Sequence, residues 1–301
     1  MGHRDSKILV LGASGLLGSR IFLELSKHYS IIGTAFKTQT SNSLIVNLDV
    51  NNPGFAEKII ALNPKIIINC IAFTNVDLCE SQRDLAWYLN AELPKKIAEL
   101  AKTLNAKLIH ISTDHFNFET INDRSELAEV RAVNFYGESK LAGEKSILAT
   151  NNSALIVRTN FFGTKPFPHI KGTFFESVIK NTYSNRETRG YKDIHFSPIS
   201  ISELIRSLLC LLPLNPYGVI NICGNSSISK YEFCIELVRV MNGSTELIQE
   251  VSYEFEPNSI KRPLDMSMSN HLYCKITGKT ILSYKEMLEE EYSLFNEARS
   301  E

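Results

Sequence analysis

The sequence predicts an α/β protein built on a doubly wound parallel sheet, with a smaller C-terminal α/β lobe. Short β-branched runs alternate with helical patterns in the first half of the chain, which is typical of parallel strands connected by helices. Apolar runs such as Ile66-Ile67-Ile68 suit strands that are buried on both faces. Gly12, Gly15 and Gly18 follow the first such run and open the first helical pattern.

The individual elements follow from the spacing of apolar residues along the chain. Strands are predicted at 7–11, 31–36, 44–48, 66–70, 107–111 and 154–157. Helices are predicted between them at 16–27, 55–62, 85–104 and 134–148. The later chain is less regular, with helices expected at 203–212, 230–241 and 284–296, a strand at 218–222, and loops at 161–171 and 254–263.

No linker divides the chain, so the second lobe is expected to arise from insertions and the C-terminal third. We therefore assign residues 1–157 to a nucleotide-binding domain, completed by about 190–223. The substrate-binding lobe is assigned to 158–189 and 224–301.

Composition excludes several classes of protein. The chain has 301 residues, 44% hydrophobic and 22% charged, and a formal net charge of -1, so nucleic acid is not an expected partner. Six cysteines without a CxxC pair suggest neither a metal site nor a redox pair, and they fit a reducing cytoplasm. The N-terminus has no signal-peptide core, and Arg206 and Pro213 interrupt the longest apolar stretch, so no membrane association is expected.

The glycine motif predicts a site for a dinucleotide. One glycine lets the strand turn sharply into the helix, one lets the backbone approach a pyrophosphate, and one allows close packing of helix and strand. The helix N-terminus then offers free N–H groups to the phosphates. In this position a Rossmann-type site is favoured over a merely structural turn, and its expected contacts are Gly12, Ser14, Gly15, Leu16, Leu17 and Gly18.

The coenzyme preference is expected to depend on the end of the second strand. The stretch Gly33-Thr34-Ala35-Phe36-Lys37 lacks the acid that would bind an unmodified ribose. Lys37 could meet a 2′-phosphate, so NADP(H) is favoured and NAD(H) is the alternative; Lys37 as a solvated charge is the competing interpretation. Further cofactor contacts are expected from Asp49 and Val50 near the adenine, and from Ala72, Phe73 and Thr74 beyond the fourth strand. Later in the chain, Ser112, Tyr136 and Lys140 are also expected to contact the cofactor.

Tyr136 and Lys140 are the predicted catalytic pair. They lie four residues apart and so share one face of a helix. A free tyrosine has a pKa of about 10, and a nearby ammonium lowers it. Ser112 and Thr113 end the fifth strand at the sheet edge where ligands bind, and the Thr113 hydroxyl could polarise a carbonyl. A tyrosine and a lysine at this spacing also arise by chance on solvent-facing helices.

Residues near this pair are candidates for contacts with the substrate. Asp114 and His115 could bind substrate hydroxyls, with His115 as an auxiliary proton donor, or they could be a cap and a surface residue. Asn160 and Arg262 are further candidate substrate contacts. Arg158 and Arg262 could also bind the base or pyrophosphate of a nucleotide, the alternative for each being a surface ion pair.

Four segments, 69–77, 110–116, 136–145 and 261–268, together resemble the extended short-chain dehydrogenase/reductases, and among them the dTDP-4-dehydrorhamnose reductases. The resemblance is strong over roughly the first 160 residues and patchy afterwards. It implies NAD(P)H-dependent reduction of a 4-keto group on a nucleotide-linked 6-deoxysugar, in polysaccharide or deoxysugar biosynthesis. It further implies Tyr136 as proton donor, Lys140 as its partner, Thr113 as carbonyl ligand, and a homodimer as a possible assembly.

The chain departs from that family in the expected sugar pocket. His115 stands where the family usually has an aromatic residue, and Phe161-Phe162 where it often has tryptophan. The related dehydratases place Glu at the position of His115, so dehydration is disfavoured. A sugar-nucleotide epimerase is an alternative function. The chain also resembles the regulatory β-subunit of methionine adenosyltransferase, so an NADP-binding regulatory subunit stays open.

Overall fold

The computed structural model describes residues 7–36, 42–118, 124–168, 170–253 and 260–300. The chain forms two compact units. The first unit comprises Met1–Ser112, Asn134–Val157 and Leu211–Val219, and the second comprises Thr113–Val133, Arg158–Cys210 and Ile220–Glu301. Each unit is therefore assembled from segments that are distant in the sequence.

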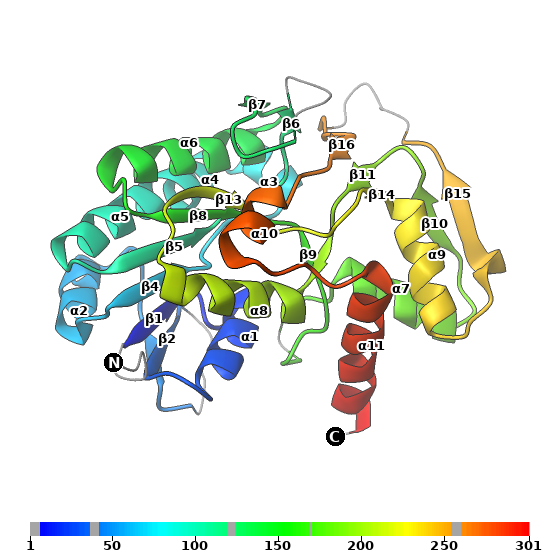
Figure 1. Cartoon of the computed structure of the whole chain (residues 1–301), viewed down its shortest axis with the longest axis horizontal. Helices are drawn as coiled ribbons and strands as arrows, with labels where there is room; N and C mark the ends of the chain where they lie inside the picture. Colours follow the sequence, from blue (N-terminus) through cyan, green and yellow to red (C-terminus); the bar gives the residue numbers. More distant parts are fainter. Residues whose placement is uncertain (1–6, 37–41, 119–123, 169, 254–259, 301) are drawn as a thin grey trace. The chain divides into compact units, whose positions relative to one another are not determined.

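A seven-stranded parallel sheet forms the centre of the first unit, as the sequence predicts (Figure 1). The strand order is β13-β8-β5-β4-β1-β2-β3, which reverses direction between β1 and β4. Ligands bind at the carboxyl ends of strands beside such a reversal. The strands are β1 (Ile8–Leu11), β2 (Ile31–Ala35), β3 (Ile45–Asn47), β4 (Ile66–Asn69), β5 (Lys107–Ile111), β8 (Leu155–Arg158) and β13 (Gly218–Asn221), the ends of β8 and β13 falling in the second unit.

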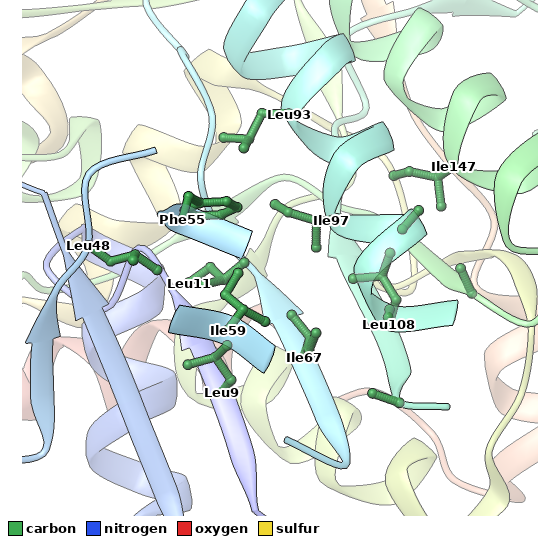
Figure 2. Packing of buried hydrophobic residues seen from close by; sticks show 14 of the residues in the cluster. Leu9, Leu11, Leu48, Phe55, Ile59, Ile67, Leu93, Ile97, Leu108 and Ile147 are labelled. Carbon is green, nitrogen blue, oxygen red and sulfur yellow. The ribbon is translucent and has the colours of Figure 1, made fainter. Parts of the chain in front are cut away.

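Helices cover both faces of this sheet, so its central strands carry apolar residues on each side. One face forms a core with α2 (Phe55–Leu62), α5 (Leu93–Thr103) and α6 (Phe135–Thr150), shown in Figure 2. α1 (Leu16–Leu25) lies on the other face. Gly33 pairs with Val10 in register, and a Cβ on Gly33 would lie 3.1 Å from the Phe22 ring of α1. Leu9 and Leu11 point the opposite way, into the core of Figure 2.

The predicted helix at 85–104 is wrong in one respect, because the segment is not a single α-helix. It contains α4 (Arg83–Trp87), a π-helical turn at Tyr88–Glu92, and α5, preceded by α3 (Val76–Ser81). Pro94 lies in the first turn of α5 and has no N–H to donate to the carbonyl of Asn90. A π-turn accommodates this missing bond without ending the helical path.

The described part of the second unit contains four small sheets and most of the later helices. Its helices are α7 (Phe174–Tyr183), α8 (Ile201–Leu211, except its last residue), α9 (Lys230–Val240), α10 (His271–Thr277) and α11 (Tyr284–Ser300). The sheets pair β10 (Thr188–Tyr191) with β15 (Ile248–Val251), β9 (Phe161–Phe162) with β12 (Ile199–Ser200), β6 (Asn117–Phe118) with β7 (Val130–Arg131), and β11 (His195–Phe196) with β14 (Ile228–Ser229) and β16 (Asp265–Met266).

The loop expected at 161–171 therefore begins with a short strand, β9, because its backbone pairs with β12. Most of the loop expected at 254–263 lies outside the described residues. No helix in the described part of the chain is long and apolar enough to cross a membrane.

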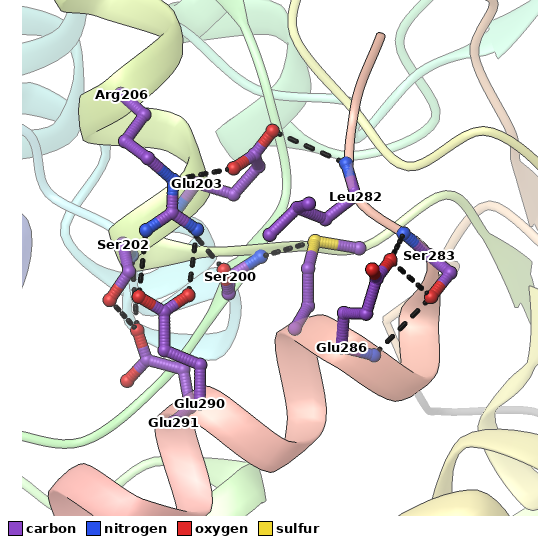
Figure 3. Close-up of polar contacts among 10 residues, drawn as sticks. Ser200, Ser202, Glu203, Arg206, Leu282, Ser283, Glu286, Glu290 and Glu291 are labelled. Carbon is purple, nitrogen blue, oxygen red and sulfur yellow. Dashed lines mark hydrogen bonds and ion pairs between the residues drawn. The ribbon is translucent and has the colours of Figure 1, made fainter.

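Charged side chains join α8 to α11 in the second unit (Figure 3). The Arg206 guanidinium donates to both carboxylate oxygens of Glu290, each at 2.7 Å, and to Glu203 at 2.7 Å. Ser202 donates to the fully buried Glu291 from its hydroxyl at 2.7 Å and from its backbone N–H at 3.0 Å. The bonds to Glu203 and Glu291 satisfy carboxylates that would otherwise be costly to bury, whereas Glu290 is partly exposed.

Candidate cofactor and catalytic site

The glycine motif forms the turn between β1 and α1, and each glycine meets a different requirement. Gly12 has a φ of 82°, which disfavours any residue with a Cβ. A Cβ on Gly18 would lie 2.2 Å from the Gly12 carbonyl oxygen, so the third glycine permits the helix to pack on the turn. Gly15 is exposed at the N-cap of α1, where no side chain caps the helix.

This turn fits the pyrophosphate of a dinucleotide. The first turn of α1 contains no acidic residue, and its free N–H groups are therefore available to an anion. Leu17 is buried, so only its backbone could contact a cofactor, whereas Ser14 and Leu16 are half-buried. The sequence did not single out Thr34, whose Oγ1 accepts from Gly12 N–H at 3.2 Å and whose carbonyl accepts from Ala13 N–H at 2.8 Å.

The predicted adenosine contacts are only partly described. Lys37 lies outside the described residues. The Asp49 carboxylate accepts from Asn51 N–H at 2.8 Å and so closes a local turn. Val50 packs against the core, and its carbonyl accepts from the Tyr88 hydroxyl at 2.7 Å.

The segment after β4 is held in place by Asn90 of the π-turn, which sequence reasoning missed. Asn90 is fully buried; its Oδ1 accepts from Phe73 N–H at 2.8 Å and its Nδ2 donates to the Phe73 carbonyl at 3.0 Å. Nδ2 also donates to Ser139 Oγ at 3.0 Å. One amide therefore links the expected cofactor segment Ala72-Phe73-Thr74 to the helix that carries Tyr136.

Helix α6 approaches the π-turn unusually closely. A Cβ on Gly143 would lie 2.1 Å from the Asn90 carbonyl oxygen, the same carbonyl that Pro94 leaves without its helical donor. Asn134 caps the helix by accepting from Gly137 N–H at 3.0 Å. Tyr136 is 8% exposed and packs in a cluster that includes Phe73.

Lys140, four residues after Tyr136 on α6, is buried in the first unit, with 1% of its surface exposed. Its Nζ donates to the Ile111 carbonyl at 2.9 Å and lies 3.4 Å from His110 Nε2. Burial lowers the pKa of Lys140 to about 8, although the carboxylate of Glu144 acts in the opposite direction.

The Ser112 hydroxyl is engaged by the same helix. It donates to Oε1 of the buried Glu144 at 2.5 Å, which fixes the end of β5 against α6. The hydroxyl proton of Ser112 is therefore already bound by a carboxylate. A contact between Ser112 and the cofactor stays a prediction.

Four of the predicted substrate contacts, Thr113, Asp114, His115 and Asn160, lie in the second unit and form two hydrogen-bonded pairs. Thr113 is buried, and its Oγ1 accepts from His115 N–H at 3.1 Å. Asp114 is 3% exposed and accepts from Asn160 Nδ2 at 2.7 Å. Burial raises the pKa of Asp114, while the bond from Asn160 and the charge of Lys230 act to lower it.

Lys230, at the start of α9, is a charged residue of this cluster that sequence reasoning missed. Its Nζ lies 3.2 Å from the centroid of the Phe196 ring, and burial lowers its pKa. Burial, together with the charges of Arg262 and Lys230, lowers the pKa of His115 to about 4. His115 is therefore neutral at pH 7. Arg262, the remaining predicted substrate contact, is exposed.

Arg158, considered above as a nucleotide contact, is 5% exposed and lies over the Phe116 ring at 5.4 Å. This arrangement buries the guanidinium against an aromatic face. No signal in the sequence distinguishes such a buried arginine from one that faces a ligand.

The parallel sheet with its glycine turn, together with the Tyr136–Lys140 pair, defines an extended short-chain dehydrogenase/reductase. Residues 6–296 match the family model of the RmlD substrate binding domain, and the chain belongs to this family.

Relatives agree with this assignment. The spore coat polysaccharide biosynthesis protein SpsK of Bacillus subtilis is 26% identical over 287 residues, covering 95% of this chain and 96% of SpsK. The dTDP-4-dehydrorhamnose reductase of Bacillus anthracis, solved in complex with NADP, superposes with a TM-score of 0.84 at 26% identity, covering 96% of this chain and 99% of that one. The methionine adenosyltransferase 2 subunit beta of Rattus norvegicus is 31% identical over 153 residues, which cover 50% of this chain and 46% of that protein.

Proposed function

We propose that this protein reduces a keto group on a nucleotide-activated 6-deoxysugar, with NADPH as the reductant. The observation that carries this proposal is the pairing of Tyr136 with a buried Lys140 on one face of α6. The fixed position of α6 supports it, because Asn90 and Gly143 tie that helix to the segment after β4. Polysaccharide or deoxysugar biosynthesis is the process in which we place the reaction.

The residues of the site divide the chemistry among them. When bound, NADPH supplies the hydride that reaches the carbonyl carbon. Tyr136 gives its phenolic proton to the oxygen as the C=O double bond becomes a C–O single bond, leaving an alcohol and a tyrosinate that solvent reprotonates. The ammonium form of Lys140 stabilises the tyrosinate, and Thr113 holds the carbonyl oxygen.

Two features support NADP(H) over NAD(H). The described end of β2 and the residue after it, Ala35-Phe36, provide no carboxylate for an unmodified ribose. The Bacillus anthracis relative is in complex with NADP. We assign sugar contacts to Thr113, Asp114, His115 and Asn160, and a nucleotide contact to Arg262. Cytoplasmic location and a homodimer stay predictions.

The test is oxidation of NADPH and NADH, followed at 340 nm, with 4-keto-6-deoxysugars on dTDP, GDP, UDP and CDP carriers. Turnover with one carrier supports the proposal and identifies both base and coenzyme. Tyr136→Phe should lower kcat by a factor of about 10² or more and leave NADPH binding intact. Tyr217→Phe, at an exposed position, is the control. A Tyr136→Phe variant with more than about a tenth of wild-type kcat would remove the proton-donor role.

A regulatory subunit is the second candidate, favoured by the similarity to methionine adenosyltransferase 2 subunit beta over half the chain. The same experiment separates the two functions. Tight NADPH binding without turnover of any keto-sugar, combined with a change in the activity of added methionine adenosyltransferase, would replace the reductase by the regulatory function.

A further inference from the structure

Asn69, His110 and Lys140 form a buried row of polar side chains across β4, β5 and α6. Asn69 and His110 are fully buried, and Lys140 is 1% exposed. The mechanism above uses only the lysine. The protons along this row can be placed one by one, because each hydrogen bond constrains the next.

The amide of Asn69 has only one orientation that satisfies its neighbours. Ile71 N–H donates to Asn69 Oδ1 at 3.0 Å, and a backbone N–H can only donate. Asn69 Nδ2 therefore lies 3.0 Å from His110 Nδ1 and donates to it, since an amide nitrogen cannot accept. His110 must carry its proton on Nε2, because burial lowers its pKa well below the usual range and keeps the ring neutral.

That Nε2–H faces the amine of Lys140 at 3.4 Å. An ammonium has three N–H donors and no lone pair, so it cannot accept this hydrogen bond. A neutral amine can accept from His110 and still donate to the Ile111 carbonyl at 2.9 Å. The hydrogen bonds of the row are therefore complete only when Lys140 is uncharged.

Two further titratable groups face Lys140, Glu144 and Cys70. Glu144, on the same helix, favours the ammonium, while its Oε1 also accepts from Ser112. Cys70, after β4, is a neutral thiol because burial raises its pKa to about 12. Burial lowers the pKa of Lys140 to about 8, so a hydrogen bond that only the neutral amine can accept acts in the same direction as burial and shifts the pH at which Lys140 loses its charge.

We propose that His110 is a positioning residue whose tautomer, fixed by Asn69, favours the neutral amine of Lys140 and so sets the pH range in which this lysine is charged. This effect of His110 on the charge of Lys140 applies to the cofactor-free protein. Only its consequence for catalysis rests on the proposed function. If Lys140 must be charged for turnover, activity falls as the pH rises through the titration of Lys140.

Nuclear magnetic resonance of the cofactor-free protein tests the charge directly. Histidine labelled with ¹⁵N should show His110 protonated on Nε2 in the wild type, a measurement that needs no variant. The ¹³Cε signal of Lys140, assigned by its loss in Lys140→Met, should report the titration. In His110→Gln the amide oxygen can accept from the ammonium, so the midpoint should rise by at least about one pH unit. The exposed His28→Gln is the matched control.

Each outcome decides the proposal. A proton on Nδ1 in the wild type, or an unchanged Lys140 midpoint in His110→Gln, would overturn it. With turnover established, the alkaline limb of kcat against pH should move in His110→Gln by the same shift. A purely structural role for His110 would lower activity without moving that limb. A shifted midpoint with an unmoved limb would overturn the catalytic consequence, and absence of turnover would affect only the proposed function.

Discussion

Two glycines of the β1–α1 turn offer a sharp test of how the cofactor site is built. In Gly18→Ala the new Cβ would lie 2.2 Å from the Gly12 carbonyl oxygen and 2.8 Å from its carbon, against about 3.4 Å for an ordinary contact. Both neighbours are backbone atoms and cannot rotate away. Overpacking of this kind costs about 1–3 kcal/mol or more, and the better helix propensity of alanine returns about 1 kcal/mol. Because the added Cβ would meet backbone atoms, the cost should lie near the upper end, about 3 kcal/mol, and we expect a net loss of about 2 kcal/mol.

Gly15→Ala is the matched variant, because its backbone suits alanine. Gly15 has φ −84° and ψ 172°, and its added Cβ would lie 3.4 Å from the Gly12 carbonyl oxygen. Alanine lowers the conformational entropy of the unfolded chain, which stabilises the folded protein, but it is a poorer N-cap residue than glycine, which destabilises it. These two effects should cancel to within about 1 kcal/mol. The methyl group would instead occupy the exposed approach to the helix N-terminus, so NADPH affinity should fall at least about tenfold.

Urea unfolding followed by fluorescence provides the assay, because Trp87 is the only tryptophan of the chain and belongs to the first unit. NADPH binding is measured by titration of the same variants. Equal destabilisation by both substitutions would refute the distinction between packing and ligand approach. A Gly18→Ala midpoint equal to that of the wild type would refute the packing of α1 on the turn.

Three further outcomes follow from polar groups of the two units. Burial raises the pKa of Asp114 to about 7, so the folded protein binds this proton more tightly than the unfolded chain, and the contribution of Asp114 to stability falls as pH rises from about 4 to about 7. Asp114→Asn should therefore be more stable than wild type at pH 8, but not at pH 4, in urea unfolding. Arg206→Gln should lose about 1 kcal/mol or less, reduced further in 1 M salt, because its fork on Glu290 is partly exposed; equal losses at both salt concentrations would contradict this. Asn90→Ala should cost about 2–3 kcal/mol and weaken NADPH binding by freeing Phe73, as unfolding and titration would show.

Several parts of the fold could be predicted because their causes are local. The strands from 7–11 to 154–157 appear where the β-branched runs lie, within a residue or two at their ends. The glycine turn is equally local, since the positive φ of Gly12 and the spacing of the glycines act within one turn of chain. The helix at 55–62 is found as predicted, ended by Asn63 in the left-handed conformation.

The π-helical turn at 88–92 could not be predicted from the local sequence. The apolar spacing of 85–104 indicates a helix, and the chain does remain helical. The amino acids near Pro94 do not reveal that the carbonyl of Asn90 meets a glycine more than 50 residues later, at Gly143. The π-turn places Asn90 where it can hold both Phe73 and Ser139.

By itself the sequence determined the fold class, the glycine turn and the Tyr136–Lys140 pair, because each depends on residues within about one helical turn or one strand. Only the tertiary structure decided the charge environment of that pair. His110 meets Asn69 because β4 and β5 are neighbours in the sheet, and it meets Lys140 because α6 packs over them. Strand order and helix packing set which distant side chains share a buried space, and burial with a fixed hydrogen-bond direction then sets their protonation.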